Sequence, residues 1–89
     1  MSVKDIFPLT IIADRYDGVF SGGKYTAWGC DPWDIPPEVD DGDNICRNFW
    51  ETYDLPVGRG ETPMEAYYDL IVREREFRAN WNKEHGIIL

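Results

Sequence analysis

The sequence of 89 residues has no long hydrophobic run. Its uninterrupted apolar stretches stop at three residues, as in Ile11–Ala13. A membrane-spanning helix needs about 20 such residues, and the core of a signal peptide needs about 7–15. We therefore expect neither element and place the protein in the cytoplasm of a host cell. Four Trp, five Tyr and four Phe exclude a wholly disordered chain and favour one globular domain over residues 1–89.

Cysteine and histidine are also scarce. Two cysteines, Cys30 and Cys46, are too few for a disulfide framework, and with the single His85 they do not complete a structural zinc site. We expect both cysteines to be reduced thiols and His85, at the exit of the last predicted helix, to have a structural or neutral role. Because no nucleophile stands beside an evident base, the sequence predicts a protein that is not an enzyme and uses no metal and no cofactor.

Basic residues are nearly absent from the middle of the chain. The formal net charge is −8, and residues 28–54 hold eight acidic side chains against the single Arg47. Binding to nucleic acid or to an anionic membrane needs a basic surface, so both are disfavoured. A protein partner with a basic surface is favoured, because opposite charge speeds encounter. The alternative is an acidic loop that serves solubility alone.

The N-terminal third predicts an antiparallel hairpin. Residues 6–13 are β-branched and apolar, which is typical of a strand. Residues 24–28 alternate in polarity, with Tyr25 and Ala27 on the face opposite Trp28. Asp-Gly and Gly-Gly pairs between these segments indicate a glycine-rich tip.

The central segment contains prolines and aspartates. We expect no regular element over residues 29–43, because proline removes a backbone donor and restricts its neighbour. A short helix is predicted over residues 44–53, capped by Asp43 or Asn44, with one apolar face turned inward. Residues 55–59 predict a short edge strand, since Pro56 has no donor for a central ladder.

The last third predicts a long helix over residues 63–84. Thr62 and Glu65 form a capping-box pair around Pro63, and His85-Gly86 is expected to end the helix. Glu74 and Arg78 are spaced as an ion pair, and Ile87–Leu89 is expected to dock, as a final strand. Five apolar residues are expected to pack on the sheet of residues 6–30: Tyr67, Leu70, Ile71, Phe77 and Trp81.

Together these patterns predict an α+β fold of order β-β-α-β-α. A small antiparallel sheet would be packed by the long C-terminal helix and by one short helix.

The acidic segment is the candidate partner-binding site. Its run of aspartates fails the EF-hand pattern, because Ile45 falls at the fifth position counted from Asp41, where an oxygen ligand is needed. Loose binding of calcium or magnesium stays open. An exposed Trp among acids is typical of an interface anchor, and the alternative is that Trp33 and Ile35 fold down as a lid on the core. The candidate residues are Asp31, Trp33, Asp34, Glu38, Asp40, Asp41 and Asp43.

The strand-to-helix junction carries a local resemblance. Gly58-Arg59-Gly60 ahead of a helix has the form of an anion-binding turn, but Glu61 and Glu65 would repel phosphate, which favours ordinary turn chemistry. The run Gly60-x-Thr62-x-x-Glu65-Ala66 resembles the junction of HicB-type antitoxin domains, which implies a small sheet backed by the following helix. The chain departs from those domains by its inserted acidic segment and by the lack of a DNA-binding tail.

The whole chain, short and acidic with no catalytic set, resembles phage-encoded defence inhibitors of the anti-CRISPR and antirestriction type. That resemblance implies a phage or mobile-element protein that inhibits a host nucleic-acid-binding defence complex. Its acidic loop would occupy a basic groove, with carboxylates standing where phosphates lie. The alternative is a HicB-like module that holds a partner through its sheet or helix face.

Overall fold

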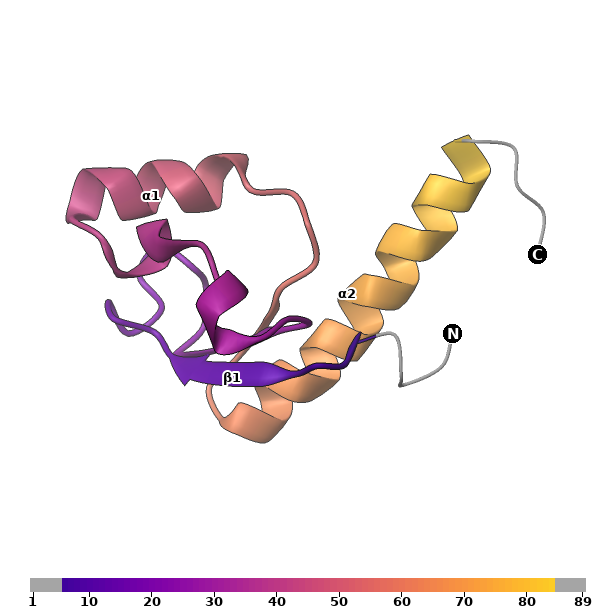
Figure 1. The fold of residues 1–89 in the computed structure, drawn as a ribbon, viewed down its shortest axis with the longest axis horizontal. Coiled ribbons are helices and arrows are strands. Elements are labelled where there is room, and N and C mark those ends of the chain that lie inside the picture. The colour runs from indigo at the N-terminus through magenta and orange to yellow at the C-terminus, as the bar shows by residue number, and fades with distance from the viewer. Residues whose placement is uncertain (1–5, 85–89) are drawn as a thin grey trace.

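A three-stranded antiparallel sheet forms the middle layer of the protein (Figure 1). The computed structural model describes residues 6–84. Strand β2 lies between β1 and β3, and two short 3-10 turns precede the first helix. The predicted α+β class and the order of strands and helices are confirmed. In chain order the elements are β1 (Thr10–Ala13), β2 (Tyr25–Trp28), η2 (Pro32–Asp34), η3 (Pro37–Asp40), α1 (Asp43–Thr52), β3 (Gly58–Gly60) and α2 (Pro63–Glu84).

The predicted hairpin is present, with a shorter first strand. Thr10 pairs with Trp28 and Ala13 with Tyr25, and β3 then pairs with the other side of β2. Strand β1 begins at Thr10 rather than at residue 6, since Pro8 has no N–H to give to a ladder. Strand β3 lies at an edge of the sheet, as predicted, and covers only residues 58–60.

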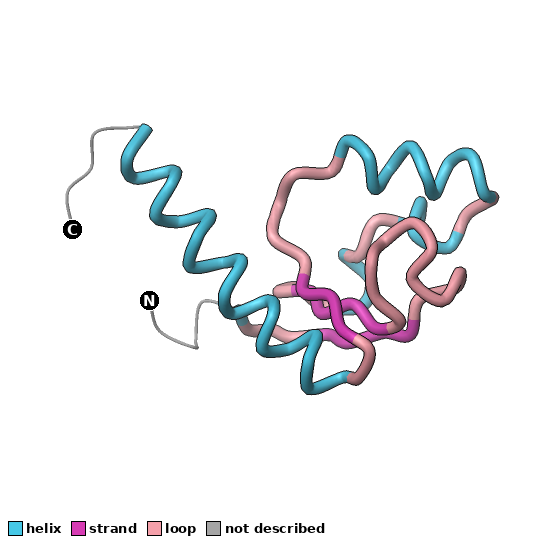
Figure 2. Tube along the Cα trace, turned by 180° about the vertical axis from the view of Figure 1, so that it is seen from behind, coloured by secondary structure: helices cyan, strands magenta, loops and turns pink. Residues whose placement is uncertain are grey.

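Both faces of the sheet are covered, so the protein has three layers. Ala27 packs with Ala66 and Leu70 of α2 on one face. Trp28 points to the other face, where it packs with Cys46 and Trp50 of α1. Figure 2 shows α1 and α2 on opposite sides of the strands. The sheet is therefore packed by the long helix and by the short helix, as predicted, and α1 with the segment before it forms a second hydrophobic cluster.

Helix α2 meets the sheet through small residues. Ala66 and Leu70 are fully buried against Gly58 and Gly60 of β3. The predicted cap is present with one difference: the Thr62 hydroxyl accepts the Glu65 N–H at 3.1 Å, while the Glu65 carboxylate accepts the N–H of Glu61 at 3.1 Å and not that of Thr62.

Part of the predicted α2 stripe is wrong. Leu70 is buried, and Tyr67 and Ile71 pack at the edge of the same cluster. Phe77 is 38% exposed, because the C-terminal half of α2 extends beyond the sheet (Figure 1). The Trp81 side chain lies outside the described part of the structure. The Glu74–Arg78 ion pair is confirmed, at 3.3 Å.

The proline-rich segment is more regular than predicted. Pro32 and Pro37 each begin a 3-10 turn, where their fixed φ suits the first helical position. Helix α1 begins at Asp43, so its N-cap residue is Gly42 and not Asp43 or Asn44, and no described side chain caps it. The expected docking of Ile87–Leu89 and the role of His85 lie outside the described residues. Neither described α-helix is long and apolar enough to cross a membrane.

Candidate functional site

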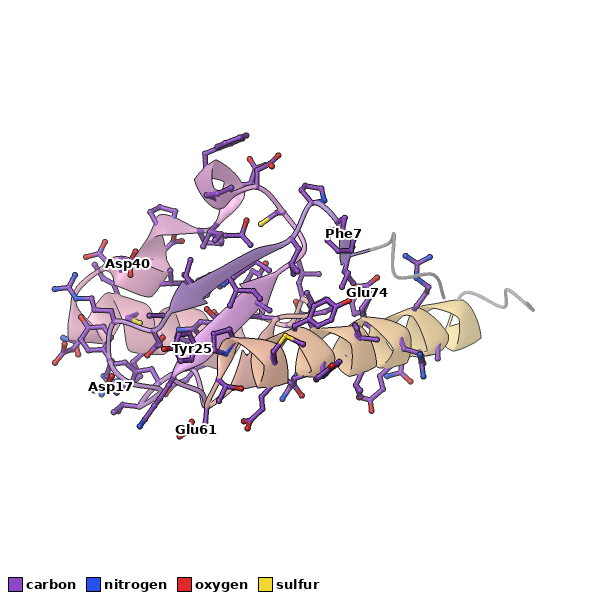
Figure 3. The ribbon with its side chains drawn as sticks, turned by 90° about the horizontal axis from the view of Figure 1, so that it is seen from below. Phe7, Asp17, Tyr25, Asp40, Glu61 and Glu74 are labelled. Atoms are coloured by element: carbon purple, nitrogen blue, oxygen red, sulfur yellow. The ribbon has the colours of Figure 1, made fainter. Side chains whose placement is uncertain are left out.

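The seven candidate residues lie in the layer on the α1 side of the sheet. Five of them lie in η2, in η3 or at the first residue of α1, while Asp31 directly precedes η2 and Asp41 directly follows η3. In Figure 3, Asp40 lies at the end of the molecule away from the C-terminal half of α2. Two of the seven, Asp31 and Glu38, are partly buried. The exposed members are Trp33, Asp34, Asp40, Asp41 and Asp43.

The carboxylates form two groups around the two cysteines. Burial raises the pKa of the Cys30 thiol, and the negative charges of Asp34 and Asp31 raise it further. The second group stands around Cys46. Burial again raises the pKa of this thiol, followed by the charges of Asp14, Asp40 and Asp43. The site is therefore divided between the η2 region and the tip formed by η3 and α1.

Asp14 is a member of this surface that sequence reasoning missed. It directly follows β1, in a part of the chain with balanced charge, and only the fold brings it to the η3 tip. Its carboxylate accepts the N–H groups of Tyr16 and Gly18 at 3.1 and 2.7 Å, which holds the start of the 14–24 loop. Asp17, in the same loop, is exposed and lies at the same end of the molecule as Asp40 (Figure 3).

The 14–24 loop holds the acidic tip through the backbone. The Arg15 guanidinium donates to the Asp40 carbonyl oxygen, and the Tyr16 hydroxyl donates to the Asp41 carbonyl oxygen at 2.6 Å. Among the described residues the ion pairs, Arg73–Asp69 and Arg78–Glu74, both lie on α2. The tip is thus fixed in place while its carboxylates form no ion pair within residues 6–80.

Trp33 and Ile35 behave differently from each other. The Trp33 side chain is 79% exposed, so it does not close over the core. Ile35 packs against the cluster of Trp28, Cys46 and Trp50, as a lid residue would. The lid interpretation therefore holds for Ile35 and is wrong for Trp33. A large apolar side chain beside two carboxylates is left facing solvent.

The core under the acidic tip contains an unusual polar pair. The Cys46 thiol is fully buried and donates to the Val39 carbonyl oxygen at 3.5 Å. The buried Trp50 indole N–H has no other hydrogen-bond partner among the described residues, and its interaction with the Cys46 sulfur lowers the pKa of that thiol. Burial outweighs this effect, so the pKa is raised overall. Both cysteines are free thiols, as predicted.

This environment predicts a loss of stability at alkaline pH. In the unfolded chain Cys46 ionises near its ordinary pKa of 9.0, whereas the folded chain keeps the proton. The folded state then binds more protons, and the free energy of unfolding falls as the pH rises through that value. We expect urea unfolding at about pH 7 and about pH 9.5 to show this decline, and the decline to be shallower in Cys46→Ala. Equal slopes in the two proteins would contradict the assignment.

A groove of about 320 Å³ lies between α2 and the segment leading into β3. Arg59 and Arg73 line it together with Tyr53, Leu55 and Phe77. The Arg59 guanidinium lies 5.0 Å from the centre of the Trp50 ring, and burial, followed by the charge of Arg73, lowers its pKa.

Asp69 connects the two arginines of this groove. Its carboxylate accepts the Arg59 backbone N–H at 2.8 Å and Arg73 Nε at 2.5 Å. The Gly58-Arg59-Gly60 segment is a strand whose backbone is engaged in this way and not an anion-binding turn. No three His, Cys, Asp or Glu side chains within the described region form a metal-binding group.

Comparison of the chain with protein-family models, with curated proteins and with solved structures found no match. The resemblances to HicB-type antitoxins and to phage defence inhibitors therefore remain predictions.

Proposed function

We propose that the protein is a non-enzymatic inhibitor of phage or mobile-element type that occupies the nucleic-acid-binding groove of a host defence complex. The observation that supports this is the anchoring of the acidic tip. Arg15 and Tyr16 bond the backbone at Asp40 and Asp41, which leaves the carboxylates exposed on a held segment. A nucleic acid presents its phosphates in the same manner, as fixed negative charges on an ordered backbone.

The proposed mechanism has two parts. Exposed carboxylates of Asp40, Asp41 and Asp43 attract a basic groove and raise the rate of encounter, in competition with nucleic acid. Trp33 then inserts into an apolar pocket beside the groove and slows dissociation. The two acidic groups, at η2 and at the η3 tip, contact different parts of the partner.

A second candidate function is supported by the junction before α2. Thr62 and Glu65 form the predicted cap and Ala66 packs on Gly60, so the segment that resembles HicB-type domains does join a small sheet to its helix. In that function a partner binds the sheet or helix face. Such an apolar contact changes little with ionic strength, whereas an acidic-surface contact weakens as salt rises.

The proposed function is tested with Asp40→Asn, Asp41→Asn and Asp43→Asn combined. The partner is first captured from bacterial lysate with the wild-type protein and released with short duplex DNA, which selects nucleic-acid-binding proteins. With the purified partner, we expect the triple variant to associate more slowly and with a flatter salt dependence. Each lost carboxylate contributes roughly 0.2–1 kcal/mol, as exposed ion pairs do.

The matched control changes the same amount of charge elsewhere. Glu51→Gln, Asp54→Asn and Glu76→Gln lie on exposed positions outside the seven candidates, and we expect wild-type association from this variant. Trp33→Ala should keep the wild-type melting temperature, because the indole is 79% exposed, and should speed dissociation. A triple Asn variant that binds and inhibits like wild type at every salt concentration would refute the mimicry and favour the second candidate.

A further inference from the structure

Helix α2 carries an apolar stripe on the side turned away from the sheet. Met64, Tyr68 and Val72 follow one another at intervals of four residues, which places them on one face. They are 54%, 57% and 50% exposed. In Figures 1 and 2 the strands and α1 lie on one side of α2. The stripe is opposite the face on which Ala66 and Leu70 are buried.

The charges at the two ends of this stripe are opposite in sign. Glu61 lies seven residues before Tyr68, and Arg75 lies seven residues after it. At 100° per residue Arg75 falls within about 20° of Tyr68 around the helix axis, and Glu61 lies two residues before the first residue of α2. Both side chains are exposed. The Glu65 carboxylate bonds the Glu61 backbone N–H and so is engaged in the cap, and Glu61 is the acidic residue that precedes the stripe along the chain.

We propose that this stripe binds a second copy of the chain, with the two α2 helices antiparallel and related by a two-fold axis at Tyr68. A two-fold interface must be complementary to itself, and the order acid, apolar stripe, base meets this condition. Met64 of each copy then lies against Val72 of the other. Glu61 of each copy lies against Arg75 of the other, twice in the dimer.

The position of the acidic surface is compatible with this dimer. Residues 28–54 carry most of the net charge, and they lie in the layer on the other side of the sheet from α2. Pairing through α2 therefore keeps the two acidic surfaces apart and facing outward. The inference does not depend on the proposed function, because it concerns a different face.

The test begins with the mass of the purified protein in solution, measured by analytical ultracentrifugation over a range of concentrations. We expect a reversible dimer, weakened at least about tenfold by Tyr68→Glu, since an aromatic residue on the axis contributes twice. Val19→Glu is the control, because it also places an acid at an exposed apolar position (74%) but on the 14–24 loop. It should dimerise as wild type does. Circular dichroism shows whether each variant is folded.

Exchanging the end charges tests the register. Glu61→Arg and Arg75→Glu should each weaken the dimer by roughly three- to thirtyfold, because each places like charges together twice. Mixed in equal amounts, the two variants should form a heterodimer about as tight as the wild-type dimer, since every pair is again opposite in charge. A wild-type protein that is monomeric up to millimolar concentration would overturn the proposal. A mixture no tighter than the separate variants would overturn the antiparallel register.

Discussion

Replacing Gly58 by alanine is expected to destabilise the protein by roughly 3 kcal/mol, a large share of the stability of so small a domain. A Cβ at this position would overlap the Ala66 carbonyl oxygen and lie 2.6 Å from the Leu70 nitrogen and 2.7 Å from its Cβ. These contacts are with the backbone of α2 or beside it, so no side-chain rotation relieves them. The helix must move away from β3, which opens the core between them.

The measurement is the melting temperature, which we expect to fall by more than about 10 °C in Gly58→Ala. Gly60→Ala should act in the same direction, because its Cβ would lie 2.5 Å from the Ala66 nitrogen. Gly42→Ala is the matched control: nothing lies within 4 Å of a Cβ there, so only the poorer N-cap residue is expected to destabilise the protein, by about 0.5–1 kcal/mol. A Gly58→Ala protein as stable as Gly42→Ala would show that α2 is not seated on the strand.

Introducing an aspartate at Leu70 is expected to unfold the protein, at roughly 4 kcal/mol or more. Leu70 is 1% exposed and packs with Ile6, Ala27 and Ala66, none of which offers a partner for a carboxylate. Ile71→Asp should destabilise by about 1–2 kcal/mol, because Ile71 lies partly buried at the edge of the cluster.

The third position in this series is Ala79, which is exposed on the same helix. Ala79→Asp should leave the urea midpoint close to that of the wild type. The series therefore separates the effect of burial from the effect of a charge in the helix. The urea midpoint should be highest for Ala79→Asp, lower for Ile71→Asp and lowest for Leu70→Asp. If Ile71→Asp were the most destabilising of the three, Ile71 and not Leu70 would lie at the centre of the buried face of α2.

Local sequence signals determined most of the elements. The Thr62–Glu65 cap sets the start of α2, and the alternation over Tyr25–Trp28 predicts both the strand and the face of each side chain. These features depend on neighbours in the chain, so residue type and spacing are enough to predict them. The same holds for the ion pair between Glu74 and Arg78.

The candidate site was predictable only in part. The excess of acid over residues 28–54 is visible in the sequence, and so is the presence of Trp33 among aspartates. The sequence left open whether Trp33 covers the core, because burial depends on how much of the cluster Ile35 already fills. It also missed Asp14, since a residue after β1 reaches the η3 tip only when the 14–24 loop packs there.

The sequence by itself determined the fold class, the order of elements and the place of the negative charge, because each depends on composition or on contacts a few residues apart. The tertiary structure decided which residues form the contacts between secondary-structure elements. Gly58 and Gly60 have the composition of a turn, yet they lie in a strand on which α2 sits, since only the paired layers show how closely two backbones approach. It also decided that Phe77 stays partly exposed, because the sheet is too short to reach the C-terminal half of α2.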